Sequence, residues 1–525
     1  MTERVQSSVN GAQALIRTLV DAGVATCFTN PGTSEIHFVA ALDSVPRMRA
    51  VLTLFEGVAT GAADGYARMT AAPAATLLHL GPGLGNGLAN LHNARRAKVP
   101  VVNIVGDQAT YHAPYDAPLQ SDIETIARNV SAWVRTSTRT EELGRDAIEA
   151  ITAATGPPGQ VATLIVPADV SWQEGAQAAA PPQPTASPRV SVDVIEVVAK
   201  TIRGGRRTGI LLGGKALREP GLMAAARIAS ATGTKLFAER SAARLERGAG
   251  LPAVERLAYW PELVSTQLDA LEHLVLVDAK APVSAFAYRG KESSLVPRGC
   301  QVHELSPPAC DVLGSLEDLM EALDAADARP ALQARSVPPP PTGPLTAEKV
   351  CQAVGAILPE GAIISDEAIT SALALPSNTV GAPRHDWLPL TGGAIGQGLP
   401  VAVGAAIACP DRPVIALEAD GSALYTIQSL WTMAREQLDV TVVIFNNRAY
   451  GILNTELARA GVQDAGPKAK AQLDLGDPAL DFVELGTGLG ISSRRVDTAE
   501  KLTGALDRAI ADPGPHLIEA LIPAV

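Results

Sequence analysis

Residues 414–422 read VIALEADGS and residues 440–451 read VTVVIFNNRAYG, and together they decide the fold class of this chain. Each stretch opens with an apolar, β-branched run of the length of a buried parallel strand. Residues 425–437 carry a helical pattern that connects the two runs. The unit predicts two neighbouring parallel strands joined by a crossover helix. Their polar turns then share the carboxyl edge of the sheet, where open α/β sheets bind ligands.

The two polar turns carry the side chains that a metal and phosphate site needs. Asp420 supplies a carboxylate and Asn447 an amide oxygen, and Mg²⁺ accepts few such protein ligands before completing its shell with substrate phosphates. Gly421 permits close approach of the backbone to a phosphate, and Ser422 is able to donate a hydrogen bond to it. For the Asp-Gly pair alone, two ordinary polar loops of an unrelated α/β domain are the alternative.

Proline-rich stretches divide the chain. At 525 residues it exceeds the size at which single cores stop growing, so two or three domains are expected. Residues 176–188 and 337–343 are rich in proline and predict stiff exposed linkers. They leave three blocks, 1–175, 189–335 and 341–525.

Apolar runs of strand length alternate with helical patterns in all three blocks. This alternation predicts an α/β fold with three doubly wound parallel-sheet domains. The predicted strands cover residues 24–28, 48–54, 75–80, 101–105 and 162–166 in the first block, 208–212, 235–237, 274–277 and 301–304 in the second, and 362–364, 414–417, 441–445 and 517–520 in the third.

Composition excludes several classes of partner. The net charge is −12 and no Lys/Arg-rich block occurs, which argues against nucleic acid because phosphate neutralisation needs clustered cations. The five cysteines are scattered, without a C-x-x-C pattern, as is typical of a reduced compartment. No apolar run has membrane length, and residues 1–10 lack a secretory pattern. We therefore expect a cytoplasmic protein without a membrane partner.

The unit at 414–451 resembles the metal-diphosphate motif of thiamine diphosphate enzymes, in which GDG is followed by NN. The spacing of the two parts in this chain is similar to that in the family, although Ala419 replaces the first glycine. Three N-terminal stretches extend the resemblance: FTNPGTSE at 28–35, EGVATGAADGYAR at 56–68 and LHLGPGLGN at 78–86. It covers nearly the whole chain and is closest to the decarboxylase and acetolactate synthase branch, which includes benzoylformate decarboxylase. It implies a pyrimidine-binding, a middle and a diphosphate-binding domain, in that order.

The resemblance assigns the reaction chemistry to the first block. Glu56 is expected at N1′ of the cofactor's aminopyrimidine, where a carboxyl group among apolar side chains is suited to share a proton; a helix-start glutamate stabilised by the helix dipole is the alternative. His79 is expected to relay protons, with a packing histidine as the alternative. His112 is a second candidate relay on a loop that borders the site in relatives. Thr33 is expected to contact the substrate carboxylate.

The glycine-rich stretch 81–85 is expected to form a turn that closes the site. It is also similar to a dinucleotide fingerprint, which would indicate an NAD-dependent dehydrogenase. Asn86 stands where that fingerprint needs its third glycine, and no acidic residue ends a suitable second strand, so the dehydrogenase is a distant alternative.

The resemblance assigns cofactor binding to the third block. Residues 391–400, TGGAIGQGLP, are similar to the segment beneath the bent cofactor. Ile395 falls at the position of the aliphatic wedge that brings the reacting atoms together. Gly393 falls where a main-chain carbonyl accepts from the 4′-amino group.

The same resemblance completes the diphosphate and metal site. Thr370 and Tyr450 are expected to contact the diphosphate. The metal is expected to be held by Asp420, Asn447 and the main-chain carbonyl of Ala449.

The implied activity is thiamine diphosphate- and Mg²⁺-dependent decarboxylation of a 2-oxo acid through an enamine, with release of an aldehyde or carboligation. An acetolactate synthase that acts on pyruvate and a non-catalytic paralogue are the alternatives. Acetolactate synthases hold FAD in the middle domain, but no pattern in residues 189–335 demands it. Glu456 replaces a hydrophobic residue of benzoylformate decarboxylase and would favour a substrate with a polar or cationic tail. In the family Glu56 meets the diphosphate domain of another subunit, so a homodimer is the minimal unit and a homotetramer is usual.

Overall fold

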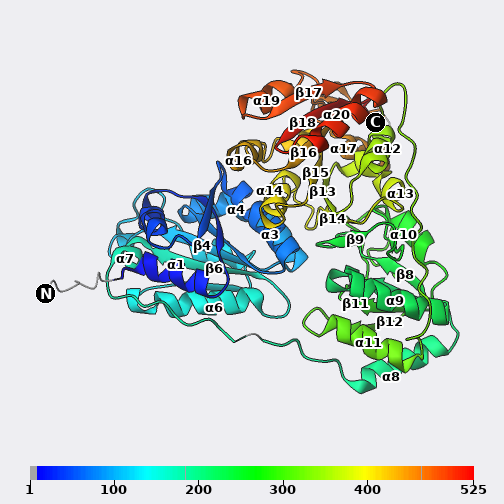
Figure 1. The fold of residues 1–525 in the computed structure, drawn as a ribbon, viewed down its shortest axis with the longest axis horizontal. Coiled ribbons are helices and arrows are strands. Elements are labelled where there is room, and N and C mark those ends of the chain that lie inside the picture. The colour runs from blue at the N-terminus through cyan, green and yellow to red at the C-terminus, as the bar shows by residue number, and fades with distance from the viewer. Residues whose placement is uncertain (1–8, 184, 463, 525) are drawn as a thin grey trace.

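The computed structural model describes residues 9–183, 185–462 and 464–524 and contains three α/β units, each built around its own sheet (Figure 1). The predicted fold class is confirmed, because the sheets are parallel apart from one edge strand. Residues 1–8, which belong to the stretch that we analysed for a secretory pattern, and Pro184 of the first linker lie outside the described residues. In Figure 1 the first unit lies at the left, the third at the upper right and the second below it.

The first unit has a six-stranded parallel sheet in the order β2-β1-β3-β4-β6-β5. All five predicted strands are present. The unpredicted one, β5, has a half-buried sequence, WVRT, that lacks an apolar run. The strands are β1 (Thr26–Asn30), β2 (Arg49–Leu52), β3 (Ala74–Leu78), β4 (Val101–Asp107), β5 (Trp133–Thr136) and β6 (Val161–Pro167), and the helices are α1 (Gly11–Asp21), α2 (Ile36–Ala41), α3 (Glu56–Thr70), α4 (Leu80–Ala97), α5 (Ile123–Arg128), α6 (Leu143–Thr155) and α7 (Ala168–Trp172).

The second unit has a five-stranded parallel sheet in the order β10-β8-β7-β11-β12. Its four predicted strands are present and are joined by the very short β10. The strands are β7 (Thr208–Leu212), β8 (Lys235–Ala238), β10 (Glu255–Arg256), β11 (His273–Val277) and β12 (Gln301–Ser306), and the helices are α8 (Val192–Arg203), α9 (Glu219–Thr232), α10 (Pro261–Leu268) and α11 (Val312–Ala322).

The third unit has a seven-stranded sheet in the order β17-β18-β16-β15-β13-β14-β9. Its edge strand β9 comes from the middle block and pairs antiparallel with β14, so the middle block also contributes to the third sheet. The strands are β9 (Leu245–Arg247), β13 (Ala362–Glu367), β14 (His385–Pro389), β15 (Val414–Ala419), β16 (Val440–Asn446), β17 (Ser492–Val496) and β18 (His516–Leu521).

The helices of the third unit cover both faces of its sheet. The predicted crossover helix is confirmed in a shorter form, because α16 begins four residues after Tyr425 and the short α15 precedes it. The helices are α12 (Ala347–Ile357), α13 (Leu375–Thr379), α14 (Gly398–Ala408), α15 (Asp420–Ala423), α16 (Ser429–Glu436), α17 (Gly451–Arg459), α18 (Pro467–Ala471), α19 (Phe482–Gly488) and α20 (Ala499–Ala511). Within the part of the chain that is described, none of the helices has both the length and the apolar surface that crossing a membrane requires.

Helices α3 and α14 join the first and third units. Both are almost entirely buried, and their backbones touch at glycines. A Cβ atom at Gly65 would lie 2.2 Å from the carbonyl oxygen of Val401, and one at Gly404 would lie 1.9 Å from that of Ala62. Side chains larger than hydrogen would therefore push the helices apart.

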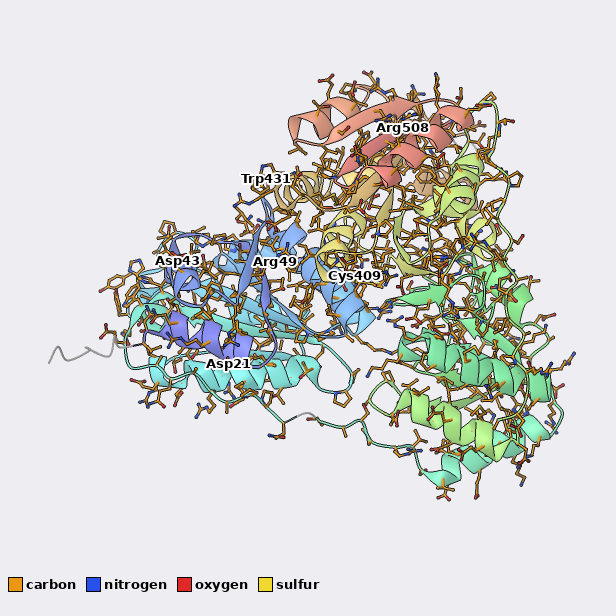
Figure 2. All side chains as sticks on the ribbon, in the orientation of Figure 1. Asp21, Asp43, Arg49, Cys409, Trp431 and Arg508 are labelled. Carbon is orange, nitrogen blue, oxygen red and sulfur yellow. The ribbon has the colours of Figure 1, made fainter. Side chains whose placement is uncertain are left out.

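A buried ion pair lies beside this helix contact. Arg68 donates to both carboxylate oxygens of Asp64, at 2.8 and 2.6 Å, and reaches the third unit at the Pro389 carbonyl (3.0 Å) and the Thr391 hydroxyl (3.1 Å). Arg68 also donates to the Ala243 carbonyl at 3.3 Å, and Asp64 accepts from Gln397 Nε2 at 3.0 Å, so the buried pair is well supplied with hydrogen-bond partners. At the periphery, Arg49 of β2, labelled in Figure 2, donates to Glu436 of α16 at 3.0 Å.

We expect Arg68→Ala to destabilise the protein strongly, at a cost of about 3–5 kcal/mol, because it leaves the buried Asp64 carboxylate without a cation and with Gln397 Nε2, at 3.0 Å, as its remaining side-chain donor. Urea denaturation checks this. Arg128→Ala is the matched control: it removes an i,i+4 pair with Glu124 that is exposed, worth less than about 1 kcal/mol. Equal losses in the two variants would contradict the interface role of Arg68.

Candidate active site

Glu56 opens helix α3 and is buried, with 8% of its surface exposed. Its Oε2 accepts a hydrogen bond from Asn86 Nδ2 at 3.0 Å. A Cβ atom at Gly83 would lie 2.8 Å from Glu56 Oε1 and 3.5 Å from the Cβ of His79. The carboxylate therefore lies against the first turns of α4, next to His79, as the sequence predicts for two residues of one site.

The glycine-rich stretch after His79 is not the predicted turn. Residues 81–85 lie within the regular helix α4, which begins directly at Leu80. The glycines serve close packing: a Cβ atom at Gly81 would lie 2.0 Å from Ser121 Oγ, and one at Gly87 would lie 2.9 Å from the Thr60 side chain. Glycine is common in turns, but at these positions it lies within a helix, because the neighbouring segments leave no room for a larger side chain.

His79 forms an ion-pair contact that the sequence analysis did not identify. Its Nδ1 lies 2.7 Å from Oε2 of Glu35, and the same oxygen accepts from the main-chain N–H of Gly32 at 2.7 Å. Burial raises the pKa of Glu35, and the contacts with Gly32 and His79 oppose that shift. Glu35 accepts from the N-cap N–H as in a capping box, but Gly32 has no side chain to complete one, so no local sequence pattern identified the residue.

The other two predicted reactive residues, Thr33 and His112, lie on exposed segments of the first unit. Thr33 is exposed at the start of the 3-10 turn Thr33–Glu35. Its neighbour Gly32 touches His79, because a Cβ atom there would lie 2.3 Å from the imidazole. His112 lies on the exposed loop after β4 and stacks at 5.9 Å on Tyr115. No contact in the described part of the chain joins His112 to Glu56 or His79, and its role stays a prediction.

The structure brings the acidic and amide turns of the third unit together. Asp420 Oδ1 accepts from the main-chain N–H of Gly421 at 2.8 Å, and its Oδ2 accepts from that of Arg448 at 2.6 Å. Burial raises the pKa of Asp420, and these N–H donors oppose the shift. Asn447 Oδ1 accepts from the Ala449 N–H at 2.9 Å. The carboxylate and the amide therefore share one edge of adjacent strands β15 and β16.

The remaining predicted diphosphate residues gather at the same edge. A Cβ atom at Gly451 would lie 3.3 Å from Asn447 Nδ2 and 3.4 Å from Thr370 Oγ1, and one at Gly421 would lie 2.5 Å from the Tyr450 ring. The Ser422 hydroxyl instead points inward and donates to the Ala419 carbonyl at 3.1 Å and to Glu418 at 3.3 Å. A contact between Ser422 and a phosphate in this arrangement comes from the main-chain N–H.

Two asparagines of α4 connect the predicted cofactor segment, residues 391–397, to the first unit. Asn90 Nδ2 donates to the Gly57 carbonyl at 2.8 Å and to the Gly396 carbonyl at 3.0 Å. Asn93 Nδ2 donates to the Ala394 carbonyl at 2.7 Å. These bonds hold the main chain on both sides of the predicted wedge, Ile395. No sequence pattern identified either asparagine. Gly393 has a φ of 85°, a conformation that favours glycine.

A pair of buried glutamates lies beneath this segment. Glu367 accepts from the Gly396 and Gly398 N–H groups at 2.9 and 2.7 Å, and Glu418 stands opposite it on the next strand. Burial raises the pKa of Glu367 to about 7, and burial beside Glu367 raises the pKa of Glu418 well above its usual range. Two such carboxyls do not both ionise readily, so near neutral pH the pair retains a proton.

Three of the ten non-glycine residues with a left-handed backbone in the described chain lie beside predicted site residues. Their φ angles are 52°, 52° and 57°, a conformation that is costly for bulky side chains and frequent at functional sites. They are Leu80 beside His79, Ile369 beside Thr370, and Arg448 between Asn447 and Ala449.

The oxygen atoms of the third unit fit a magnesium ion. Asp420, Asn447 and the Ala449 carbonyl would supply a carboxylate, an amide and a main-chain oxygen, the ligand types that Mg²⁺ prefers. The Ala449 carbonyl accepts from the Gly451 N–H at 2.9 Å and keeps a second lone pair. The described residues contain no group of three His, Cys, Asp or Glu side chains arranged for a metal, and the predicted set includes only one such side chain.

The second unit does not fit FAD. Strand order reverses between β7 and β11, where doubly wound sheets bind dinucleotides. There Gly214 N–H donates to Glu239 at 3.0 Å and Lys215 N–H donates to Asp278 at 2.8 Å. Lys98 of the first unit lies 3.0 Å from the other oxygen of Asp278. These carboxylates occupy the donors that a diphosphate would need and would repel its charge.

Comparison with known proteins identifies the relatives. Residues 9–128 match the family model for the N-terminal TPP binding domain of thiamine pyrophosphate enzymes, and residues 374–520 match that for the C-terminal TPP binding domain. The chain is 58% identical to the putative acetolactate synthase large subunit IlvX of Mycobacterium tuberculosis, over 98% of this chain and 100% of the relative. It is 29% identical to benzoylformate decarboxylase of Pseudomonas aeruginosa, over 95% and 96%.

A solved structure shares the whole fold. The thiamine diphosphate-dependent 4-hydroxybenzoylformate decarboxylase of Rhodococcus jostii superposes with a TM-score of 0.86 at 25% identity, covering 98% of this chain and 100% of that one.

We expect Gly83→Ala to weaken thiamine diphosphate binding about tenfold or more, equal to 1.4 kcal/mol, because the added methyl group displaces the Glu56 carboxylate. Fluorescence titration of the apoprotein measures this. Gly85→Ala, in the same helix, is the control: its Cβ meets nothing within 4 Å, so its binding is expected to stay unchanged. A normal affinity in Gly83→Ala would show that the carboxylate does not need this position.

Proposed function

Because the chain belongs to the thiamine pyrophosphate enzyme family, we propose that it is a thiamine diphosphate- and Mg²⁺-dependent enzyme that decarboxylates a 2-oxo acid. The observation that carries this proposal is the position of Glu56 and His79 at the start of α4, where a Cβ atom at Gly83 would lie 2.8 Å from Glu56 Oε1 and 3.5 Å from the Cβ of His79. A site of this kind offers one acid for the cofactor and one imidazole for the substrate.

The residues of the first unit manage protons in this proposal. When bound, thiamine diphosphate supplies a nucleophilic carbon and an electron sink for the bond to CO₂. Glu56 would hold a proton at its Oε1 toward the aminopyrimidine, while Asn86 holds its Oε2 in place. His79 delivers or removes the proton of the substrate-derived group, and Thr33, beside it on the neighbouring turn, binds the substrate carboxylate.

The residues of the third unit hold the cofactor. Asp420, Asn447 and the Ala449 carbonyl would hold Mg²⁺, and Thr370 and Tyr450 would contact the diphosphate beside it. The Gly393 carbonyl and the Ile395 side chain orient the rings, and the hydrogen bonds from Asn90 and Asn93 keep their segment in place. Gly421 and the N–H of Ser422 approach the phosphates, since neither position places a side chain over them.

We also propose that each site forms between two copies of the chain. Within one chain, no hydrogen bond among the described residues joins the Glu56 carboxylate to the metal residues, Asp420 and Asn447. Exposed apolar side chains occur close to both halves in sequence, as at Leu54 and at Leu424, and burial against a second copy would remove them from water. A homodimer is then the minimal unit, and a homotetramer is the expected assembly.

The substrate tail is expected to meet α17. Glu456 is not a free carboxylate there, because it accepts from the Tyr288 hydroxyl at 2.9 Å and lies 4.0 Å from Arg459. Arg459 also covers the rings of Trp260 and Tyr288, at 4.5 and 4.7 Å. This group combines aromatic surface with balanced charge, which favours a substrate with a polar or hydroxylated tail over one with a bare hydrocarbon tail.

An acetolactate synthase is the second candidate, because the 58% identical relative bears that description. It would join two pyruvate molecules instead of releasing an aldehyde. The carboxylates at the FAD position of the second unit, Glu239 and Asp278, count against it. A non-catalytic paralogue is a poor fit, because Glu56 and all three metal oxygens are retained.

The test is incubation of the purified protein with thiamine diphosphate, Mg²⁺ and a panel of aliphatic and aromatic 2-oxo acids, with CO₂ and organic products identified. We expect an aldehyde and CO₂ from at least one acid. Glu56→Gln is expected to lower kcat about 10²- to 10⁴-fold, as for loss of a proton-transfer group. Acetolactate from pyruvate would favour the second candidate, and no turnover with the cofactor bound would favour the paralogue.

A further inference from the structure

Glu35 and His79 form a pair that is built into the fold rather than placed on its surface. Glu35 ends the turn that follows β1 and is 3% exposed, while His79 ends β3, the neighbouring strand. One carboxylate oxygen, Oε2, lies 2.7 Å from both His79 Nδ1 and the Gly32 nitrogen. Two strand ends and one turn thus fix the imidazole from the Nδ1 side.

The Glu35 carboxylate contacts His79 and forms no ion pair with a described lysine or arginine. Its second oxygen, Oε1, is buried and has no hydrogen-bond partner among the described residues. A Cβ atom at Gly106 would lie 1.7 Å from this oxygen, so glycine is required on β4 to make room for it. A buried, half-satisfied carboxylate is costly, and burial raises the pKa of Glu35.

The chemistry of the pair follows from which imidazole nitrogen is engaged. An ionised carboxylate only accepts hydrogen bonds, so beside ionised Glu35 the neutral imidazole carries its hydrogen on Nδ1 and keeps a lone pair on Nε2. Carboxylates orient imidazoles in this way in catalytic triads and metal sites. Among the elements packed around His79, the turn after β1 supplies the ionisable group in contact with the imidazole, Glu35, and Glu56 of α3 lies against Gly83, the residue that also adjoins the Cβ of His79.

We propose that Glu35 is a positioning residue that keeps His79 in the Nδ1–H tautomer, so that Nε2 is the atom that exchanges protons with the substrate. The proposal rests on the proposed role of His79 in 2-oxo acid turnover. The competing interpretation is purely structural: Glu35 only caps its own turn through the Gly32 N–H, and its contact with His79 has no consequence for the reaction.

Nitrogen-15 NMR of histidine-labelled holoenzyme separates the two interpretations, with the His79 signals assigned by their loss in His79→Gln. In the wild type we expect neutral His79 with its hydrogen on Nδ1. In Glu35→Leu we expect the hydrogen to move largely to Nε2 and kcat to fall about tenfold to 10⁴-fold, the range from an oriented proton relay to a lost triad carboxylate. The affinity for thiamine diphosphate is expected to stay unchanged.

Two further variants separate the proposed role of Glu35 from a folding defect in Glu35→Leu. Glu35→Gln keeps an acceptor for Gly32 and His79, so it should retain the Nδ1–H tautomer and recover most of the kcat lost in Glu35→Leu. Gly106→Ala displaces Oε1 without touching Glu56 or His79, so it should shift the tautomer as Glu35→Leu does. Gly85→Ala serves as the neutral control.

The outcomes are distinct. Hydrogen on Nε2 in the wild type, or an unchanged tautomer in both Glu35→Leu and Gly106→Ala, would overturn the positioning role. A shifted tautomer with unchanged kcat would overturn its link to the reaction. A wild-type protein that shows the Nδ1–H tautomer but turns over no 2-oxo acid would contradict the proposed function and leave the positioning role of Glu35 intact.

Discussion

The close contact of helices α3 and α14 is the constraint on which the rest of the structure depends. Glycine–backbone contacts set the distance between the helices, and the buried Asp64–Arg68 pair fixes their register through Pro389 and Thr391. Glu56 opens α3 and the segment 391–397 leads directly into α14, so one interface positions both. A slip of the helices would displace the acid and the cofactor segment together, and no loop adjustment would restore both.

Each half of the site then uses the carboxyl edge of a parallel sheet. In the first unit, the turns after β1 and β3 bring Glu35 to His79, and in the third, the turns after β15 and β16 bring Asp420 to Asn447. Residues with a left-handed backbone conformation, such as Leu80 and Arg448, occur at these turns. Such conformations are costly and are held in place by the surrounding structure. The buried Glu367–Glu418 pair adds a further local cost beneath the cofactor segment.

Much of this arrangement could be predicted from the sequence, because strand length, crossover spacing and turn chemistry are local signals. The strands around 414–446 and the pairing of Asp420 with Asn447 are of this kind. Strand β14 was not predicted, because His385 and Asp386 interrupt its apolar pattern. The 81–85 stretch was wrongly assigned to a turn, because its glycines are needed for close packing against Ser121 and Glu56, which are distant in sequence. Asn90, Asn93 and Glu35 acquire their roles only through tertiary contacts, which no local pattern records.

The central claim is that Glu56 and Asp420 hold opposite ends of one coenzyme and come from different subunits. Subunit complementation tests it most directly: two inactive proteins, Glu56→Gln and Asp420→Ala, are co-expressed in equal amounts with different tags, and the whole mixture of dimers is assayed with thiamine diphosphate and Mg²⁺. If sites are shared, random pairing leaves one intact site in half of the dimers, so about a quarter of wild-type activity should return. Activity no higher than that of either parent, in hybrids shown to have formed, would contradict the account.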